Sequence, residues 1–81
     1  MKEIGKVTKF FDKIMVAVII LTKDVLKGDE IIIKGNNTEV KQKIESMEID
    51  RQKITSAKKG EEIAIKVNQK VNNNDIVYKL D

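Results

Sequence analysis

Apolar residues occur in short runs along the whole chain, separated by polar turn residues. The first runs cover residues 4–11, 14–21 and 31–34, and they are rich in β-branched and other large apolar residues. Towards the C-terminus, apolar positions alternate over residues 63–67, and a last run covers residues 75–80. Short segments of this kind are typical of an all-β sandwich or barrel, and none of them requires an amphipathic helix.

The residues between the runs predict where the chain turns. Asp12 and Lys13 separate the first two runs, and the sequence Leu-Lys-Gly-Asp at residues 26–29 precedes the third. The tripeptide Gly-Asn-Asn at residues 35–37 is a hairpin signal, because both residue types tolerate the positive φ of primed turns. We therefore expect the strand that begins at Thr38 to run antiparallel to residues 31–34.

The apolar positions change phase in the strand after this hairpin. Val40 and Ile44 share one phase of the two-residue period, whereas Met47 and Ile49 share the other. One extra residue between the two pairs would return the apolar side chains to the same face. We therefore predict a β-bulge near residues 45–46 that bends the strand around a barrel.

Three junctions between a turn and a strand resemble one another. Each places a residue that tolerates positive φ before an acid and an apolar strand, in Gly28-Asp29-Glu30-Ile31, Gly60-Glu61-Glu62-Ile63 and Asn74-Asp75-Ile76-Val77. The glycine or asparagine makes the turn, and the acid is expected to cap exposed backbone N–H groups. The lengths between the junctions are unequal, so they do not indicate an internal repeat.

The composition limits the chemistry. A chain of 81 residues has room for one domain, residues 1–81, and it contains no histidine and no cysteine. Disulfides, zinc sites built on thiolate or imidazole, and a histidine that could activate Ser46 or Ser56 are therefore excluded. The spacing of the carboxylates singles out no catalytic pair, and residues 72–75 indicate a plain turn more than a cation loop. We predict no enzyme activity, no catalytic residue, no cofactor and no metal site.

The net charge of +3 arises in residues 41–59, where six basic residues face three acidic ones. We predict these six as candidates for nucleic-acid binding: Lys41, Lys43, Arg51, Lys53, Lys58 and Lys59. Two of the pairs, 41/43 and 51/53, have the i, i+2 spacing at which strand residues project from one face and can follow a phosphate backbone. Arg51 is the only arginine, which argues against base-specific recognition.

Phe10 and Phe11 are the candidate anchor residues for a partner. If their strand alternates, at least one of them faces outward, where it could stack on a base or fill a pocket on another protein. The alternative is that both pack at one end of a barrel.

The N-terminal region has one feature that resembles a secretory signal. Lys2, Lys6, Lys9 and Lys13 precede the apolar residues 14–21. No cleavage site of small residues follows, and the apolar run is far shorter than the roughly 20 residues that cross a bilayer. We interpret the run as a strand buried on both faces, and we expect a cytoplasmic protein with no membrane contact.

Three stretches of the chain carry a resemblance to a known barrel. They are Leu26-Lys27-Gly28-Asp29-Glu30-Ile31-Ile32-Ile33, Ile44-Glu45-Ser46-Met47 and Ala57-Lys58-Lys59-Gly60-Glu61-Glu62-Ile63-Ala64-Ile65. Over most of residues 4–80 the chain resembles the second, β-barrel domain of translational GTPases of the elongation factor Tu type. It is also similar to the small C-terminal barrel of collagenase-like peptidases, and it looks most like a stand-alone copy. The resemblance implies a single six- or seven-stranded antiparallel Greek-key β-barrel.

The chain departs from the GTPase pattern in several places. The first hairpin of that family is usually rich in glycine, but residues 10–21 contain none, so ligand contacts of that hairpin are not carried over. Asn74 stands where the family often has glycine. The four glycines never form a phosphate loop, so we predict no GTP binding.

Three classes of function follow from these observations. The first is a binding module for tRNA, rRNA or the translation apparatus, including a ribosome-associated protein. The second is a protein-interaction module that docks on a peptidase or a translation factor, with an exposed phenylalanine as anchor and lysines as rim. The third is a structural domain with a transient partner. The sequence predicts a non-enzymatic binding module, expected to be a monomer, and binding to nucleic acid differs from a hydrophobic interface in its steep dependence on salt.

Overall fold

The computed structural model describes residues 1–80, which form strands, turns and loops without a helix. The strands are β1 (Lys2–Phe11), β2 (Val16–Leu21), β3 (Val25–Leu26), β4 (Glu30–Lys34), β5 (Glu39–Lys43), β6 (Met47–Ile49), β7 (Gln52–Ile54), β8 (Ser56–Ala57), β9 (Glu62–Lys66) and β10 (Ile76–Lys79). Every pair of neighbouring strands is antiparallel. The prediction of an all-β antiparallel fold is therefore confirmed.

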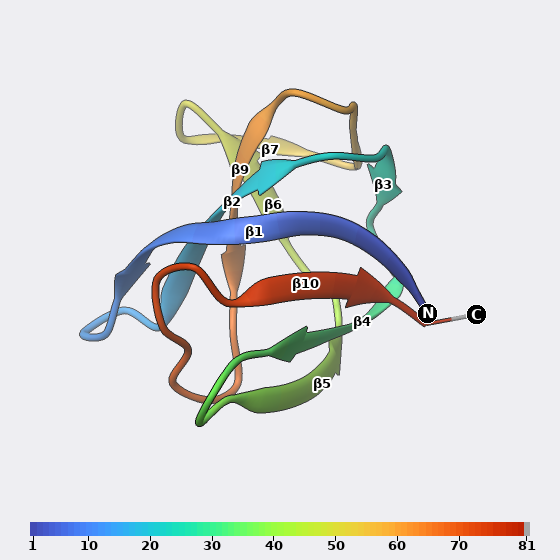
Figure 1. The fold of residues 1–81 in the computed structure, drawn as a ribbon. Coiled ribbons are helices and arrows are strands. Elements are labelled where there is room, and N and C mark those ends of the chain that lie inside the picture. The colour runs from blue at the N-terminus through green and yellow to red at the C-terminus, as the bar shows by residue number, and fades with distance from the viewer. Residues whose placement is uncertain (81) are drawn as a thin grey trace.

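Eight of the strands form one sheet that curls strongly on itself into a half-barrel (Figure 1). Their order is β5-β4-β10-β1-β2-β9-β6-β7, and β3 pairs with β8 in a separate ribbon. The first and last strands lie side by side in the middle of the sheet, with Lys2 opposite Lys79. The structure divides the chain into more strands than the expected six or seven, because β3, β6, β7 and β8 are separate strands of only two or three residues.

The concave face of the sheet holds the core. In β2 the side chains alternate strictly, with Ala17, Ile19 and Leu21 buried and the residues between them half-buried. Aliphatic side chains from the other strands meet them, and the largest that are fully buried include Ile4, Ile31, Ile33, Ile44, Met47, Ile63, Ile65 and Val77. Each large side chain buried in this way contributes about 1.5–3 kcal/mol to folding. The predicted burial of β2 on both faces is only half right, because its outer face is half exposed.

A buried glutamine side chain joins β5 to the end of β9 across the open side of the half-barrel. The amide Nε2 of Gln42 donates to the carbonyl of Lys66 (2.9 Å), and its Oε1 accepts the backbone N–H of Asn68 (2.8 Å). Gln42 is only 8% exposed, so these bonds are shielded from water. We call this junction the seam, because here the Gln42 side chain joins two segments that do not pair as strands.

The phase change after β5 is real, but a bulge does not cause it. β5 ends at Lys43 and β6 begins at Met47, so residues 44–46 are a connection between two strands with different partners. Ile44 still bonds to the turn before β4, donating to the carbonyl of Asp29 (2.9 Å). The chain then leaves β4, and β6 pairs with β9 instead. With this change of partner, the other phase of the two-residue period faces the core.

The hairpin at residues 35–38 is present and joins the paired strands β4 and β5. The expected positive φ is not found, because none of residues 35–37 has a positive φ. Gly35 is required for a different reason: a Cβ there would clash with the carboxylate of Asp75. A second hairpin escaped the sequence analysis. Asp50 (φ 50°) and Arg51 (φ 66°) form a two-residue turn between β6 and β7, with Ile49 opposite Gln52. Positive φ at both central residues is the type I′ pattern.

The three similar junctions adopt the predicted geometry. At the first, Gly28 has a φ of 96°, and the carboxylate Oδ2 of Asp29 accepts the backbone N–H of Leu26 (2.8 Å). Gly60 and Asn74 have φ values of 92° and 75° at the equivalent positions. The equivalent bonds join the N–H of Lys58 to Oε1 of Glu61 (2.7 Å) and the N–H of Asn72 to Oδ2 of Asp75 (2.8 Å). The prediction of capped turns is confirmed at all three.

Candidate functional site

The hairpin between β1 and β2 presents an apolar tip. Phe11 is 46% exposed and Ile14 is 57% exposed, whereas Phe10 is partly buried and packs against the core. The prediction that at least one phenylalanine faces outward is therefore confirmed, and the alternative that both pack at a barrel end is wrong. Ile14 was predicted to belong to the buried run of residues 14–21, but it lies in the turn before β2 and is exposed.

Apolar side chains continue from this tip along the outer face of β2. Phe11 lies opposite Val16, and beyond it Val18 and Ile20 are also half-buried. Ile14 and Val16 line a hollow of about 310 Å³, whose other lining residues are Ser46, Glu48, Ala64, Ile65 and Lys66. We call Phe11, Ile14, Val16 and Val18 the hairpin surface. It combines exposed apolar groups with charged residues at its edge.

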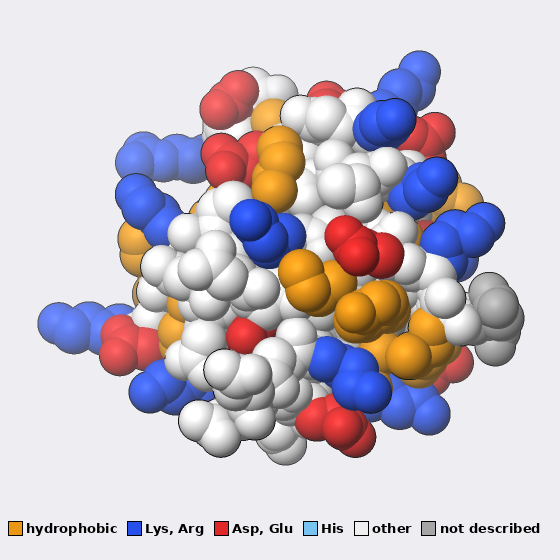
Figure 2. All heavy atoms as spheres, in the orientation of Figure 1, with side chains coloured by type: hydrophobic (Ala, Val, Ile, Leu, Met, Phe, Trp, Pro, Cys, Tyr) orange, Lys and Arg blue, Asp and Glu red, His pale blue; other side chains and the backbone are white. Residues whose placement is uncertain are grey.

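A second apolar area covers the outer face of β10 and β4. Figure 2 shows apolar side chains gathered over β10, with lysine and acidic side chains around them. Ile76 and Tyr78 alternate with the buried Val77, and Tyr78 lies opposite Ile32 on β4. Ile32 is only 8% exposed, so its neighbours cover it well. This area is therefore better packed than the hairpin surface.

Leu26 forms a third apolar feature on the far side of the core. It is 57% exposed, as much as Ile14, and lines a broad hollow of about 680 Å³. The hollow is lined also by Lys27, Gly28, Lys43, Ile44, Glu45 and Thr55. Most of the surface that lines this hollow is apolar, so Leu26 belongs to a separate apolar feature outside the hairpin surface.

The six candidate nucleic-acid residues fall in three places. Lys41 and Lys43 share the exposed face of β5, as predicted. Arg51 lies in the β6–β7 turn, so the expected projection of Arg51 and Lys53 from one strand face is wrong. The last two, Lys58 and Lys59, lie in the exposed loop after β8. β5 and β7 are the two edges of the main sheet, at the bottom and the top of Figure 1.

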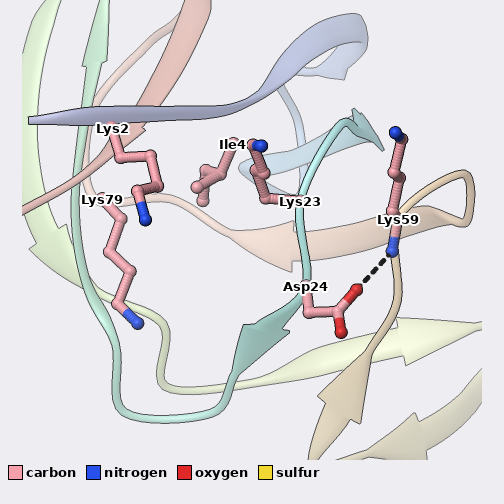
Figure 3. A pocket seen from close by; sticks show the side chains of 6 residues that line it. All are labelled: Lys2, Ile4, Lys23, Asp24, Lys59 and Lys79. Carbon is pink, nitrogen blue, oxygen red and sulfur yellow. Dashed lines mark hydrogen bonds between the residues drawn. The ribbon is translucent and has the colours of Figure 1, made fainter.

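A pocket at the opposite end of the molecule from the hairpin tip gathers lysines that are far apart in the sequence. Lys2, Lys23, Lys59 and Lys79 line a hollow of about 380 Å³ together with Asp24 and Ile4 (Figure 3). Lys79 lies two residues beyond the buried Val77 on β10, so it continues an inward-facing row past the end of the core. Of the four, only Lys59 is among the predicted binding residues, because nothing in the linear order of the other three indicates that they line one hollow.

The acidic residues that the structure describes do not gather into a cluster for a metal ion. No group of three or more acidic residues that could hold a metal ion occurs within residues 1–80. Asp75, the carboxylate of the 72–75 turn, is 5% exposed and bonded to the N–H of Asn72. Residues 1–80 also contain no helix with the length and hydropathy needed to cross a membrane.

Comparison with known proteins identifies similar segments within larger proteins. No protein-family model matches the chain. An uncharacterized protease of Methanocaldococcus jannaschii is 42% identical over 79 residues, which is 96% of this chain and 19% of the protease. A collagenase of Porphyromonas gingivalis is 38% identical over 80 residues, or 96% of this chain and 22% of the collagenase. The chain thus spans about a fifth of the length of the curated relatives it matches.

Solved structures show the same fold. The C-terminal domain of a candidate U32 peptidase from Geobacillus thermoleovorans superposes with a TM-score of 0.92 over 99% of this chain and 93% of that domain, at 17% identity. A selenomethionine variant of that domain gives a TM-score of 0.89. These matches support the collagenase-like peptidase part of the resemblance, and they give no support to a relationship with translation elongation factors. The chain is similar to the small C-terminal barrel of U32 peptidases and collagenases.

Proposed function

We propose that this chain is a non-catalytic protein-interaction module that acts together with a peptidase catalytic domain. The observation that supports the proposal is the extent of the similarity: nearly the whole chain matches a segment that makes up about a fifth of two named proteases. A barrel that makes up so small a share of a larger protein is suited to an accessory role beside a separate catalytic part. The activity of the relatives then belongs to the part of them that this chain does not cover.

The residue chemistry agrees with an accessory role. Without histidine or cysteine the chain has no imidazole general base and no thiol nucleophile for peptide hydrolysis. Ser56 is exposed and Ser46 half-buried, and no hydrogen bond joins either hydroxyl to a base among residues 1–80. We therefore assign peptide-bond cleavage to a separate catalytic domain.

We assign docking to the hairpin surface. Phe11 and Ile14 are among the most exposed large apolar residues of the chain; Phe11 ends β1, and Ile14 lies in the turn that follows it. Apolar and aromatic anchors at the centre of an interface carry most of its binding energy. Neighbouring half-buried Val16 and Val18 extend the apolar area along β2, and Lys66 and Glu48 supply a polar rim.

Binding to a peptidase catalytic domain tests this proposal. The Methanocaldococcus jannaschii protease, made without the segment that matches this chain and checked for folding by circular dichroism, is titrated with the barrel in a calorimeter. We expect a saturable complex with the wild-type barrel. The double variant Phe11→Glu/Ile14→Glu should raise the Kd by about 30-fold or more, because it replaces the apolar anchors with charges that would be buried without a partner. Leu26→Glu, which alters an equally exposed apolar residue outside the hairpin surface, is the matched control.

Two outcomes would contradict the proposal. One is the absence of a complex with the wild-type barrel, and the other is an equal loss of affinity in the Leu26→Glu control. Cleavage of gelatin by the purified barrel alone would overturn its non-catalytic assignment.

Nucleic-acid binding by residues 41–59 stays a prediction. The feature in its favour is the shared exposed face of Lys41 and Lys43 on β5. Titration of bulk tRNA and rRNA into isotope-labelled protein at low and physiological salt tests it. Amide shifts confined to residues 41–59 that fade as salt rises would favour this second function, and an unperturbed low-salt spectrum would remove it.

A further inference from the structure

The outer face of the sheet has a hollow beside the tip of the first hairpin. It holds about 310 Å³ and is lined in part by residues of β2, β9 and β6, which are neighbours in the sheet (Figure 1). We propose that this hollow accepts an aromatic side chain with a hydrogen-bond donor, tyrosine or tryptophan, from the partner that docks on the hairpin surface. The inference rests on the proposed function, because it names the group that such a partner inserts.

A small residue in a row of larger ones makes the hollow. Ala64 on β9 lies opposite Val18 on β2 and opposite Glu48 on β6, so the three side chains share one face of the sheet. Along β9 the next residue on this face is Lys66, which is also much larger. The methyl group of Ala64 therefore leaves a depression in the surface of the sheet. Ile14, from the turn before β2, adds a further wall.

The size and the lining of the hollow suit one aromatic ring. The lining is more apolar than polar, and Ile14, Val16 and Ala64 contribute to it. A volume of about 310 Å³ lies at the lower end of the range for small-molecule sites, so it suits a single side chain better than a long ligand. Aromatic side chains bury a large area and lose little conformational entropy when they are fixed.

Two polar groups at the hollow have no partner of their own. Within residues 1–80, no hydrogen bond or ion pair joins the Glu48 carboxylate or the Ser46 hydroxyl to another group. Both residues are half-buried, and both line the hollow. Tyrosine and tryptophan carry a donor at the edge of an apolar ring, and phenylalanine and leucine do not. The hollow therefore matches a ring with a donor better than a wholly apolar side chain.

The charges around the hollow argue against a charged anchor. Its lining contains one carboxylate, Glu48, and one ammonium group, Lys66, which balance each other. Lys53 lies opposite Glu48 on β7 and adds a positive charge outside the lining. Arginine is also common at the centre of interfaces, but here it would meet Lys66 and Lys53 as well as Glu48. A neutral ring avoids this repulsion and can still donate to Glu48.

Single amino-acid derivatives test the hollow without a partner protein. N-acetyltryptophanamide and N-acetyltyrosinamide are titrated into isotope-labelled barrel, and the shifts of backbone amides and methyl groups are followed. We expect saturable shifts at Ile14, Ala64 and Glu48, with a Kd of about 1–10 mM for these two derivatives. The corresponding phenylalanine and arginine derivatives should bind at least about threefold more weakly.

Two variants separate the shape of the hollow from its hydrogen bond. Ala64→Leu fills the hollow from the outer face of β9, so it should raise the Kd of both derivatives by about fivefold or more, with the fold checked by circular dichroism. Glu48→Leu removes the acceptor and should abolish the preference for tryptophan and tyrosine over phenylalanine. Lys41→Leu places the same side chain on the exposed face of β5, at the other edge of the sheet, and is the matched control.

The complex with the truncated Methanocaldococcus jannaschii protease separates this inference from the proposed function. We expect Ala64→Leu to raise the Kd of that complex by about tenfold or more. An unchanged Kd would overturn the inference and leave docking by the hairpin surface intact. If no complex forms, the docking proposal fails, and the derivatives alone decide whether the hollow takes a ring.

Three results with the derivatives would overturn the inference. The first is the absence of shifts at the residues of the hollow. The second is binding of the phenylalanine or arginine derivative as tight as that of the tryptophan and tyrosine derivatives. The third is a loss of affinity in Lys41→Leu as large as that in Ala64→Leu.

Discussion

Asp29, Glu61 and Asp75 hold three turns with the same hydrogen bond but in different surroundings. Each carboxylate accepts the N–H of the residue three positions earlier, at 2.7–2.8 Å. The first two bonds are exposed, whereas Asp75 is only 5% exposed and lies against Gly35. When a buried acceptor is removed, no water replaces it and the N–H donor stays unsatisfied. Losing the bond to Asp75 should therefore cost more free energy of unfolding than losing either exposed bond.

This difference predicts unequal effects of removing the carboxylates. We expect Asp75→Ala to lower the free energy of unfolding by about 1–3 kcal/mol, because the N–H of Asn72 loses its buried acceptor. Glu61→Ala removes the same bond in an exposed turn, where water replaces the acceptor, and its cost should be under about 1 kcal/mol. Urea unfolding followed by circular dichroism measures both, and equal losses would show that burial does not decide the strength of these caps.

β5 is held by a neighbouring strand and by a side chain. Its backbone pairs only with β4, and its other edge is joined to the end of β9 through Gln42. Lysines alternate with the buried residues on β5, so its exposed face is charged. An edge strand that carries lysine resists pairing with other chains.

Removal of the Gln42 amide tests this seam. We expect Gln42→Ala to cost about 1–3 kcal/mol and to speed hydrogen exchange at the amide of Asn68, which loses its acceptor. Gln52→Ala, on the exposed face of β7, provides the control and should leave both quantities unchanged. If Asn68 exchanges at the same rate in the Gln42 variant, the side chain does not close the seam.

At the scale of the whole molecule, the two ends of the chain build the middle of the sheet. β10 lies between β4 and β1, and β1 pairs with β2 on its other side. No early or late part of the chain can therefore complete the core alone. Sheets assembled from such distant segments fold more slowly than helical proteins of the same size.

We expect refolding to be a single phase in the range of milliseconds to seconds. The sequence has no proline, so the slow phase of tens to hundreds of seconds that proline isomerisation causes should be missing. Stopped-flow circular dichroism after dilution from urea measures both features. A slow phase that persists at low protein concentration would contradict the expectation.

Local signals predicted much of the fold and little of the candidate sites. The positive φ at Gly28, Gly60 and Asn74 follows from residue type and the neighbouring acid, so it was predictable. Asp50 and Arg51 carry a type I′ turn without the usual Asn-Gly signal, and this hairpin was missed. The hollow lined by Lys2, Lys23, Lys59 and Lys79 was missed for another reason: these residues share no pattern along the chain.

The sequence by itself determined the all-β class, the main turns and the limits on chemistry, because these depend on residue types and on contacts between near neighbours. Only the tertiary structure decided which strands are adjacent, how Gln42 joins β5 to β9, and which side chains share a surface. It separated the exposed Phe11 from the partly buried Phe10, left Ile14 exposed, and brought four distant lysines to the lining of one hollow. These relations arise when a curled sheet closes on its core, and no local preference of the chain encodes them.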